Sequence, residues 1–250
     1  MKTSVLTIAA ATLLSGCVIY VGNGHAGDLQ HEERTLALGA ADLKQLVADT
    51  GAGKLDIIGE EGRSDVEVVA NIYYDDAEDV RLSLVDSGSN AKLEAGFDKS
   101  FYSGNSPYID LTVKVPARFS LKLDDGSGDT DIRGLKGDLY VDDGSGDLQI
   151  QGGANAVIED GSGNLSIRQL SGKLQVEDGS GDLHISDVAG DVSIDDGSGD
   201  LTVNNIGGTV TVDDGSGDIL VDGAAGLTVV NSGSGGLKIN AINGPVKIND

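Results

Sequence analysis

The second half of the chain repeats one four-residue turn at nearly constant spacing. Asp-Gly-Ser-Gly recurs every 17 or 18 residues and is followed by a degenerate Ser-Gly-Ser-Gly that begins at Ser232. The six complete copies begin at Asp125, Asp143, Asp160, Asp178, Asp196 and Asp214. Repeats of this length are typical of solenoids, in which each repeat is one unit that stacks on its neighbours. The repeat therefore restricts the fold more than any other property of the sequence.

Apolar residues hold fixed positions relative to each turn. Four positions before it stand Leu121, Leu139, Ala156, Leu174, Val192, Val210 and Thr228, and two before it stand Leu123, Val141, Ile158, Val176, Ile194, Val212 and Val230. Similar columns follow five and seven positions after it. This alternation is typical of strands with one buried face. We predict an all-β fold, a single-stranded parallel β-solenoid (β-helix-like or β-roll-like) with two short strands in each 18-residue coil.

Residues 35–120 carry a distorted version of the pattern. Thr50-Gly51-Ala52-Gly53 fits a corner that leads into a strand, and Ser87-Gly88-Ser89 resembles another corner. We interpret residues 35–120 as irregular N-terminal rungs that cap the solenoid, and residues 121–250 as its regular part. A separate small β domain is the alternative for the irregular segment.

The N-terminus has the features of an export signal. Lys2 precedes an apolar run of about ten residues, too short to span a bilayer as a helix. Leu14-Ser15-Gly16-Cys17 resembles a bacterial lipobox, in which the cysteine becomes the lipidated first residue. We therefore expect a lipoprotein signal peptide at 1–16, and a lipidated Cys17 followed by a tether at 17–34. An ordinary secretory signal followed by a free thiol is the alternative. Cys17 is the single cysteine, so an intrachain disulfide is excluded.

The charge of the chain is strongly negative. With 41 Asp and Glu against 17 Lys and Arg, the formal net charge is -24. Phosphate backbones would be repelled, which argues against nucleic acid as a partner. Cations and basic partners remain compatible with this charge, and so does a simple role in solubility.

Three acidic columns flank the Gly-Ser-Gly corners. One includes the six aspartates that open the corners, one precedes it by a residue, and one follows four residues later. Carboxylates stacked about 4.8 Å apart repel each other by about 0.9 kcal/mol per neighbour even in water. Hydrogen bonds, raised pKa values or bound Ca²⁺ would offset this repulsion. The candidate metal ligands are Asp125, Asp143, Asp160, Asp178, Asp196 and Asp214. Apart from Ca²⁺, we expect no cofactor.

Aromatic residues gather in the irregular segment. The loop from Phe97 to Tyr108 contains Phe97, Phe101, Tyr102 and Tyr108, four of the nine aromatic residues in the chain. These four residues are a candidate contact patch for a partner. Capping of the solenoid end is the structural alternative.

The serial Gly-Ser-Gly-Asp turns between Leu-x-Val strands resemble a bacterial family of uncharacterised envelope proteins labelled putative adhesins. The resemblance covers about Leu36 to Asp250, and it implies a β-solenoid in the cell envelope. Resemblance to lipoproteins implies a membrane contact through the lipid on Cys17. Val18 after the cysteine is typical of transfer to the outer membrane in Gram-negative bacteria.

We expect a non-enzymatic envelope lipoprotein, adhesin-like or scaffolding, that contacts an envelope protein or a glycan. A Ca²⁺-dependent β-roll that binds a partner is the alternative function. An enzyme acting on polysaccharides is disfavoured, because the aspartates repeat with the coils instead of marking one site. A serine nucleophile is disfavoured as well, because no histidine column accompanies the corner serines.

Overall fold

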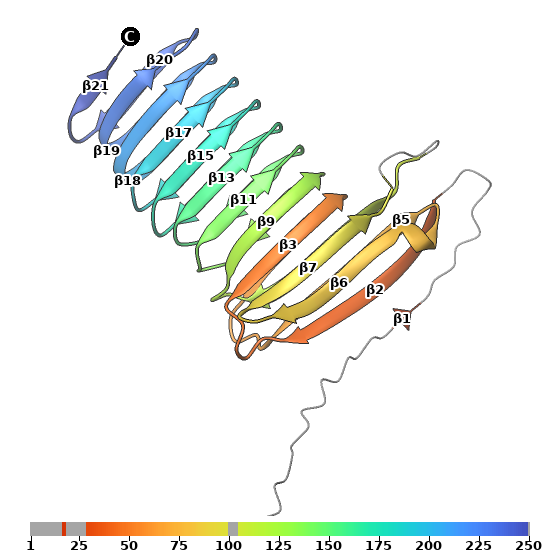
Figure 1. The fold of residues 1–250 in the computed structure, drawn as a ribbon. Helices are drawn as coiled ribbons and strands as arrows, with labels where there is room; N and C mark the ends of the chain where they lie inside the picture. The colour runs from red at the N-terminus through yellow and green to blue at the C-terminus, as the bar shows by residue number, and fades with distance from the viewer. Residues whose placement is uncertain (1–16, 19–28, 100–104, 250) are drawn as a thin grey trace, which may run out of the picture.

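The protein is a rod of stacked coils, as the computed structural model shows for residues 17–18, 29–99 and 105–249 (Figure 1). Each regular coil contributes one strand to each of two parallel sheets. The strands of sheet 1, which lead into the Gly-Ser-Gly corners, are β9 (Ser120–Ser127), β11 (Leu139–Asp143), β13 (Ala156–Asp160), β15 (Leu174–Asp178) and β17 (Val192–Asp196). The strands of sheet 2, which follow those corners, are β10 (Thr130–Arg133), β12 (Leu148–Gln151), β14 (Leu165–Leu170) and β16 (Leu183–Val188).

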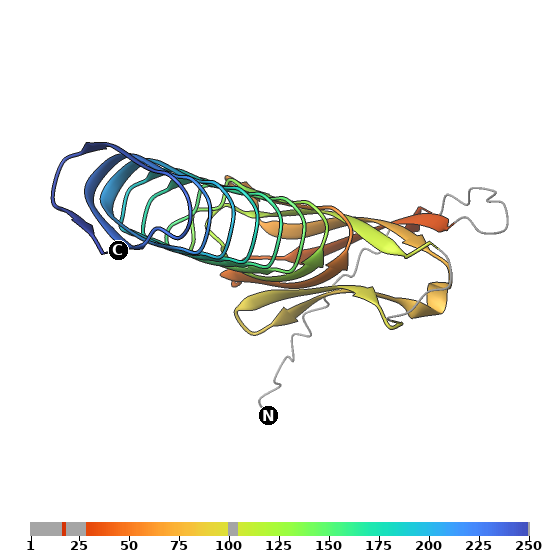
Figure 2. The ribbon, with the colours of Figure 1, turned by 90° about the horizontal axis from the view of Figure 1, so that it is seen from above.

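The last coils continue both sheets with longer strands. β18 (Leu201–Asp214) and β19 (Ile219–Asn231) each run through a second corner and so belong to both sheets, and β20 (Leu237–Ile242) and β21 (Val246–Ile248) follow. Seen from above, the coils superpose as nested loops (Figure 2).

Parallel pairing in register confirms the predicted solenoid. Leu139 of β11 lies between Leu121 and Ala156 of the neighbouring coils, and Val141 lies between Leu123 and Ile158. Along β11 the side chains alternate between buried and exposed, as the period of two requires. The columns stack into one continuous hydrophobic core that runs the length of the rod.

One assignment of columns is wrong in the final regular coil. The alignment on the turns placed Thr228 and Val230 in the interior. Instead Leu227 pairs with Val210 and Val229 with Val212, because the register shifts by one residue between the Ile206 and Thr209 pairs and shifts back before Asn231. The second shift leaves Val230 outside with 42% of its surface exposed. A bulge leaves one residue of a strand unpaired, and the constant turn spacing hides these two shifts because they cancel.

The N-terminal part contains both solenoid coils and antiparallel strands. β3 (Gln45–Ala52) and β4 (Leu55–Glu60) form a coil that pairs in parallel with β9 and β10, and Thr50 lies beside Asp125. β7 (Asn90–Phe97) and β8 (Tyr108–Pro116) pair with the other side of that coil. The coil at 45–60 therefore lies between segments that follow it in the sequence. Thr50 marks a corner position, as predicted.

Antiparallel strands complete this end of the rod. β2 (Gln30–Gly39) pairs with β5 (Asp65–Tyr74), β5 pairs with β8, and β6 (Val80–Ser87) pairs with β7. Ser87-Gly88-Ser89 is consequently the turn of an antiparallel hairpin, and its prediction as a solenoid corner is wrong. The two-residue β1 (Cys17–Val18) lies antiparallel to β2, and η1 (Ala77–Asp79) is a short 3₁₀ turn. In the described part of the chain, no helix is long and apolar enough to cross a membrane.

The corners need glycine because successive coils touch there through their backbones. Gly163 has φ of 141°, and a Cβ at this position would lie 1.7 Å from the carbonyl oxygen of Gly146 in the preceding coil. Only glycine adopts this backbone region readily, and only glycine leaves space for the neighbouring carbonyl.

Replacing Gly163 by alanine should therefore lower the free energy of unfolding by about 2–4 kcal/mol, through backbone strain and displacement of the adjacent corner. Urea unfolding followed by circular dichroism measures the change. Ser162→Ala in the same corner is the control and should stay within about 0.5 kcal/mol of the parent protein. Equal loss in both variants would contradict the role assigned to the glycine.

Candidate functional site

The aspartates that open the corners face the interior of the rod. In β11 the residues Leu139, Val141 and Asp143 alternate with exposed neighbours and so share the buried face. We call the six equivalent residues the corner ladder. Their exposed fractions are 3% for Asp125, 1% for Asp143, 4% for Asp160, 4% for Asp178, 2% for Asp196 and 0% for Asp214. Charged side chains are rarely buried to this extent without a partner, so the ladder is the most unusual chemical feature of the rod.

Hydroxyl groups satisfy the first member of the ladder. Thr50 Oγ1 donates to Asp125 Oδ1 at 2.5 Å, and Thr130 Oγ1 donates to Asp125 Oδ2 at 3.0 Å. Thr50 comes from the neighbouring coil and occupies the ladder position there. Both threonines are themselves buried. This pair of donors was not recognised in the sequence, because it depends on the non-local pairing of β3 with β9.

The middle of the ladder has no such donors. Both carboxyl oxygens of Asp143, Asp160, Asp178 and Asp196 are inaccessible and lack a hydrogen-bond partner among the described residues. At Asp214, Oδ1 accepts a hydrogen bond of 3.1 Å from the Ser216 amide, the turn geometry expected for every corner. In the middle coils the equivalent serine amides lower the pKa of the aspartate, but their geometry falls short of a hydrogen bond.

Burial raises the pKa of the whole ladder. Loss of hydration is the largest cause at each position, and it raises the pKa of Asp143 and Asp196 to about 7 and that of Asp160 and Asp178 to about 6. Neighbouring ladder carboxylates raise the values further at Asp143, Asp160 and Asp196. The pKa of Asp125 is raised as well, against the opposing effect of its two threonine donors.

The two other acidic columns have different surroundings. Asp142, Glu159, Glu177 and Asp195 point outward and are exposed or half-buried. In the third column each side chain caps the next coil. Asp147 Oδ1 accepts from the Asn164 amide at 3.1 Å, and Asp182 Oδ1 accepts from the Asp200 amide at 3.1 Å. Hydrogen bonds, one of the three expected ways to offset the repulsion between stacked carboxylates, therefore stabilise this column.

The geometry gives no direct support to calcium. A groove of about 470 Å³ follows the corner and is lined by the outward acidic column, the corner glycines and part of the ladder. Ca²⁺ requires six to eight oxygen ligands around one point. Within the described ranges, no group of three or more His, Cys, Asp or Glu side chains converges in a way that would hold a metal ion. The calcium hypothesis for the six aspartates stays a prediction.

The predicted aromatic patch divides into separate parts. Phe97 packs against the hydrophobic core, whereas Phe101 and Tyr102 lie outside the described residues. Tyr108 stacks on Tyr73 with ring centroids 4.4 Å apart, and Tyr73 stacks on His31 at 4.5 Å. His31 Nε2 also lies 3.2 Å from Asn71 Oδ1. Neither Tyr73 nor His31 was predicted as a partner of Tyr108, because three strands distant in sequence bring these rings together.

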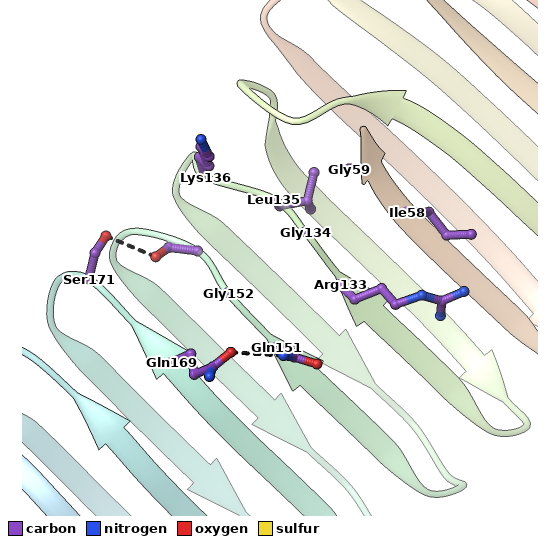
Figure 3. A pocket seen from close by; sticks show the side chains of 11 residues that line it. Ile58, Gly59, Arg133, Gly134, Leu135, Lys136, Gln151, Gly152, Gln169 and Ser171 are labelled. Carbon is purple, nitrogen blue, oxygen red and sulfur yellow. Dashed lines mark hydrogen bonds between the residues drawn. The ribbon is translucent and has the colours of Figure 1, made fainter. Parts of the chain in front are cut away.

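A shallow recess of about 680 Å³ opens at the second corner of the coils, where a strand of sheet 2 leads into the next strand of sheet 1 (Figure 3). It lies beside the one 17-residue coil, in which Gly153 replaces the leucine or other aliphatic residue found in most equivalent positions. Leu139 and Leu170 fill the space that a side chain at Gly153 would need. Gln151 Nε2 donates to Gln169 Oε1 at 2.8 Å, and Arg133 pairs with Asp131. The polar groups of the recess are thus largely engaged with one another or with side chains just outside it.

Residues 109–205 match the family model Toastrack DUF4097. No curated protein matches the chain.

Solved structures share the fold at low sequence identity. A "putative adhesin" from Parabacteroides distasonis ATCC 8503 aligns with 89% of this chain and 98% of its own, at 16% identity and a TM-score of 0.51. A "putative adhesin" from Bacteroides fragilis NCTC 9343 covers 87% and 97%, also at 16% identity and 0.51. A "putative lipid binding protein" from P. distasonis covers 88% and 97%, at 15% identity and 0.52. At these identities the likeness concerns the fold alone.

Removing the donor at the end of the ladder should destabilise the rod. Thr50→Val deletes the hydroxyl that binds Asp125, and a lost hydrogen bond to a buried carboxylate costs about 1–3 kcal/mol. Urea unfolding at pH 8 measures the loss, and Thr50→Ser, which keeps the hydroxyl, is the matched control. If the valine and serine variants unfold at the same urea concentration, the hydroxyl does not stabilise Asp125.

Proposed function

We propose that the chain is a non-enzymatic, adhesin-like module of the bacterial cell envelope, held to a membrane through lipid on Cys17. The rod would display a contact surface for an envelope protein or a glycan. The name "putative adhesin" borne by two proteins of the same fold supports this class of function. The lipobox-like Leu14-Ser15-Gly16-Cys17 supports the anchor, and Val18 after the cysteine supports an outer-membrane destination.

One observation favours a particular contact surface. His31, Tyr73 and Tyr108 form a stacked row across β2, β5 and β8, on the side of these strands opposite the buried residues Val68, Ala70 and Ile72. The three rings are half-buried, so their orientation is fixed while part of each stays accessible. Rigid aromatic side chains contribute large contact area at low entropic cost, and they are enriched where proteins bind partners. We call this row the aromatic stack.

The location of the aromatic stack fits a role in contact. Tyr108 stands at the end of the Phe97–Tyr108 loop, which carries two further aromatic residues. Elsewhere on the coils, Tyr140 is the exposed aromatic residue, and it lies beside Lys122 at 5.7 Å. The stack is therefore a local feature of β2, β5 and β8 and does not repeat along the rod. A feature that does not repeat is better suited to specific recognition than the periodic acidic columns.

Lipid anchoring is tested at the cysteine. Cys17→Ala should abolish incorporation of labelled fatty acid and move the protein from the membrane fraction to the soluble fraction of cells. A single acyl chain binds membranes only weakly, so stable anchoring requires the several chains expected of a bacterial lipoprotein. Retention of label and of membrane association in the alanine variant would refute the anchor.

Adhesion is tested with the aromatic stack. Tyr73→Thr combined with Tyr108→Thr should reduce binding to envelope preparations or to immobilised glycans at least tenfold, since aromatic anchors often contribute 2 kcal/mol or more, about thirtyfold in affinity. Threonine retains a high strand propensity, so folding should survive. Tyr140→Thr is the control, and its binding should match the parent. Undiminished binding by the double variant would exclude the aromatic stack as the contact surface.

A further inference from the structure

The corner ladder buries carboxyl groups for which the described residues provide few hydrogen-bond donors. Asp143, Asp160, Asp178 and Asp196 keep both carboxyl oxygens inaccessible and without a protein partner in the described part of the chain. An ionised carboxylate in this position loses its hydration, and the nearby serine amides offset that loss only in part. Such a group becomes neutral by binding a proton, or it draws in a cation.

Among the described residues, the charges that raise the pKa of Asp143, Asp160 and Asp196 come from other carboxylates. Asp143 faces Asp125 and Asp160 along the ladder and Asp142 on its own strand. Asp160 faces Asp178 and, across the corner, Asp147. Asp196 faces Asp178, Asp214 and its neighbour Asp195. The strands of the opposite sheet contribute apolar side chains such as Leu148, Leu165 and Leu183.

The spacing of the coils allows carboxyl groups to cooperate. Successive aspartates are Cα partners in register, for example Asp143 with Asp160 and Asp160 with Asp178. Parallel strands lie about 4.8 Å apart, so small rotations bring two such carboxyl groups within hydrogen-bond distance. A protonated carboxyl group has an O–H that can donate to the next carboxylate, and such charge-assisted bonds are short and strong. Two ionised neighbours would have no donor between them.

We propose that the corner ladder is a proton-binding spine, whose carboxyl groups take up and share protons between successive coils, so that the rod is more stable in acid than at neutral pH. The ligand is the proton itself, and the responsive element is the stack of coils. This inference does not depend on the proposed function in adhesion.

The direction of the pH effect follows from the raised pKa values. In the unfolded chain these aspartates titrate near 3.8, whereas in the rod the pKa is about 7 for Asp143 and Asp196 and about 6 for Asp160 and Asp178. The folded state therefore binds more protons than the unfolded state between these limits. Stabilisation by protons is complete below about pH 4 and is lost as the pH rises through 6 and 7. Because the sites interact, the transition should be broad.

The experiment compares two quadruple variants of the full chain. The inner variant carries Asp143→Asn, Asp160→Asn, Asp178→Asn and Asp196→Asn. The outer variant carries Asp142→Asn, Glu159→Gln, Glu177→Gln and Asp195→Asn, and so removes four carboxylates from the same four coils. Urea unfolding is measured between pH 5 and pH 8 at constant ionic strength.

The parent protein should unfold at a higher urea concentration at pH 5 than at pH 8. The inner variant should lose most of this rise and should exceed the parent in stability at pH 8, since amides can form a hydrogen-bonded ladder without charge. The outer variant should retain the rise. Equal pH profiles for the parent and the inner variant, or loss of the rise in the outer variant alone, would overturn the proposal.

A second measurement needs no variant. The side-chain carboxyl ¹³C resonances of the parent protein report the titration of each aspartate directly. A group of aspartates that titrates between pH 6 and 7 supports the spine, and midpoints that all lie below about 5 overturn it. Unfolding at pH 8 with Ca²⁺ or Mg²⁺ tests the remaining alternative. Stabilisation by Ca²⁺ alone that the inner variant abolishes would replace the proton by calcium as the ligand.

Discussion

The structure depends on one constraint, the parallel register that stacks each residue on its equivalent in the next coil. Backbone hydrogen bonds hold this register even at the corners, where the Gly146 amide donates to the Ser162 carbonyl at 3.0 Å. A residue type that suits one coil is then repeated as a column, and its energetic effect is repeated with it. Apolar residues gain from this repetition because each column becomes a continuous core. The corners require glycine in every coil for the same reason, because each coil approaches its neighbour equally closely there.

The same parallel register places the carboxylates of the three acidic columns in different surroundings. One position apart in the strand, Asp142 is hydrated at the surface and Asp143 is enclosed in the corner. Four residues after Asp143, Asp147 accepts the backbone amide of the following coil and is satisfied by it. The position of an acidic column relative to the corner therefore determines the surroundings of its carboxylates. The outward column is hydrated, the third column accepts backbone hydrogen bonds, and the middle of the corner ladder is buried without such bonds. Net charge alone could not distinguish these three columns.

Much of the regular solenoid could be predicted because its pairing is periodic in the sequence. The turns at Asp125 and Asp143 set the register, and the period of two sets which side chains face inward. That rule also implies an inward Asp143, since Val141 lies two residues before it. The order of the N-terminal strands could not be predicted, because no period relates β3 to β7 or β9. The stack of His31, Tyr73 and Tyr108 depends on that same non-local pairing, as does the bond between Thr50 and Asp125.

The ends of the corner ladder show that an acid is not required to make the fold. Thr50 occupies the ladder position in the coil before Asp125, and Ser232 follows Asp214 at the repeat distance. A hydroxyl group therefore fits the corner and is less costly to bury than a carboxylate. Six buried aspartates lower the stability that the same rod could reach with hydroxyl or apolar residues, because buried ionisable groups rarely stabilise a fold. A carboxyl group differs from a hydroxyl group in that it can bind a proton near neutral pH when it is buried, and this is the property that the proposed proton-binding spine uses in six successive coils.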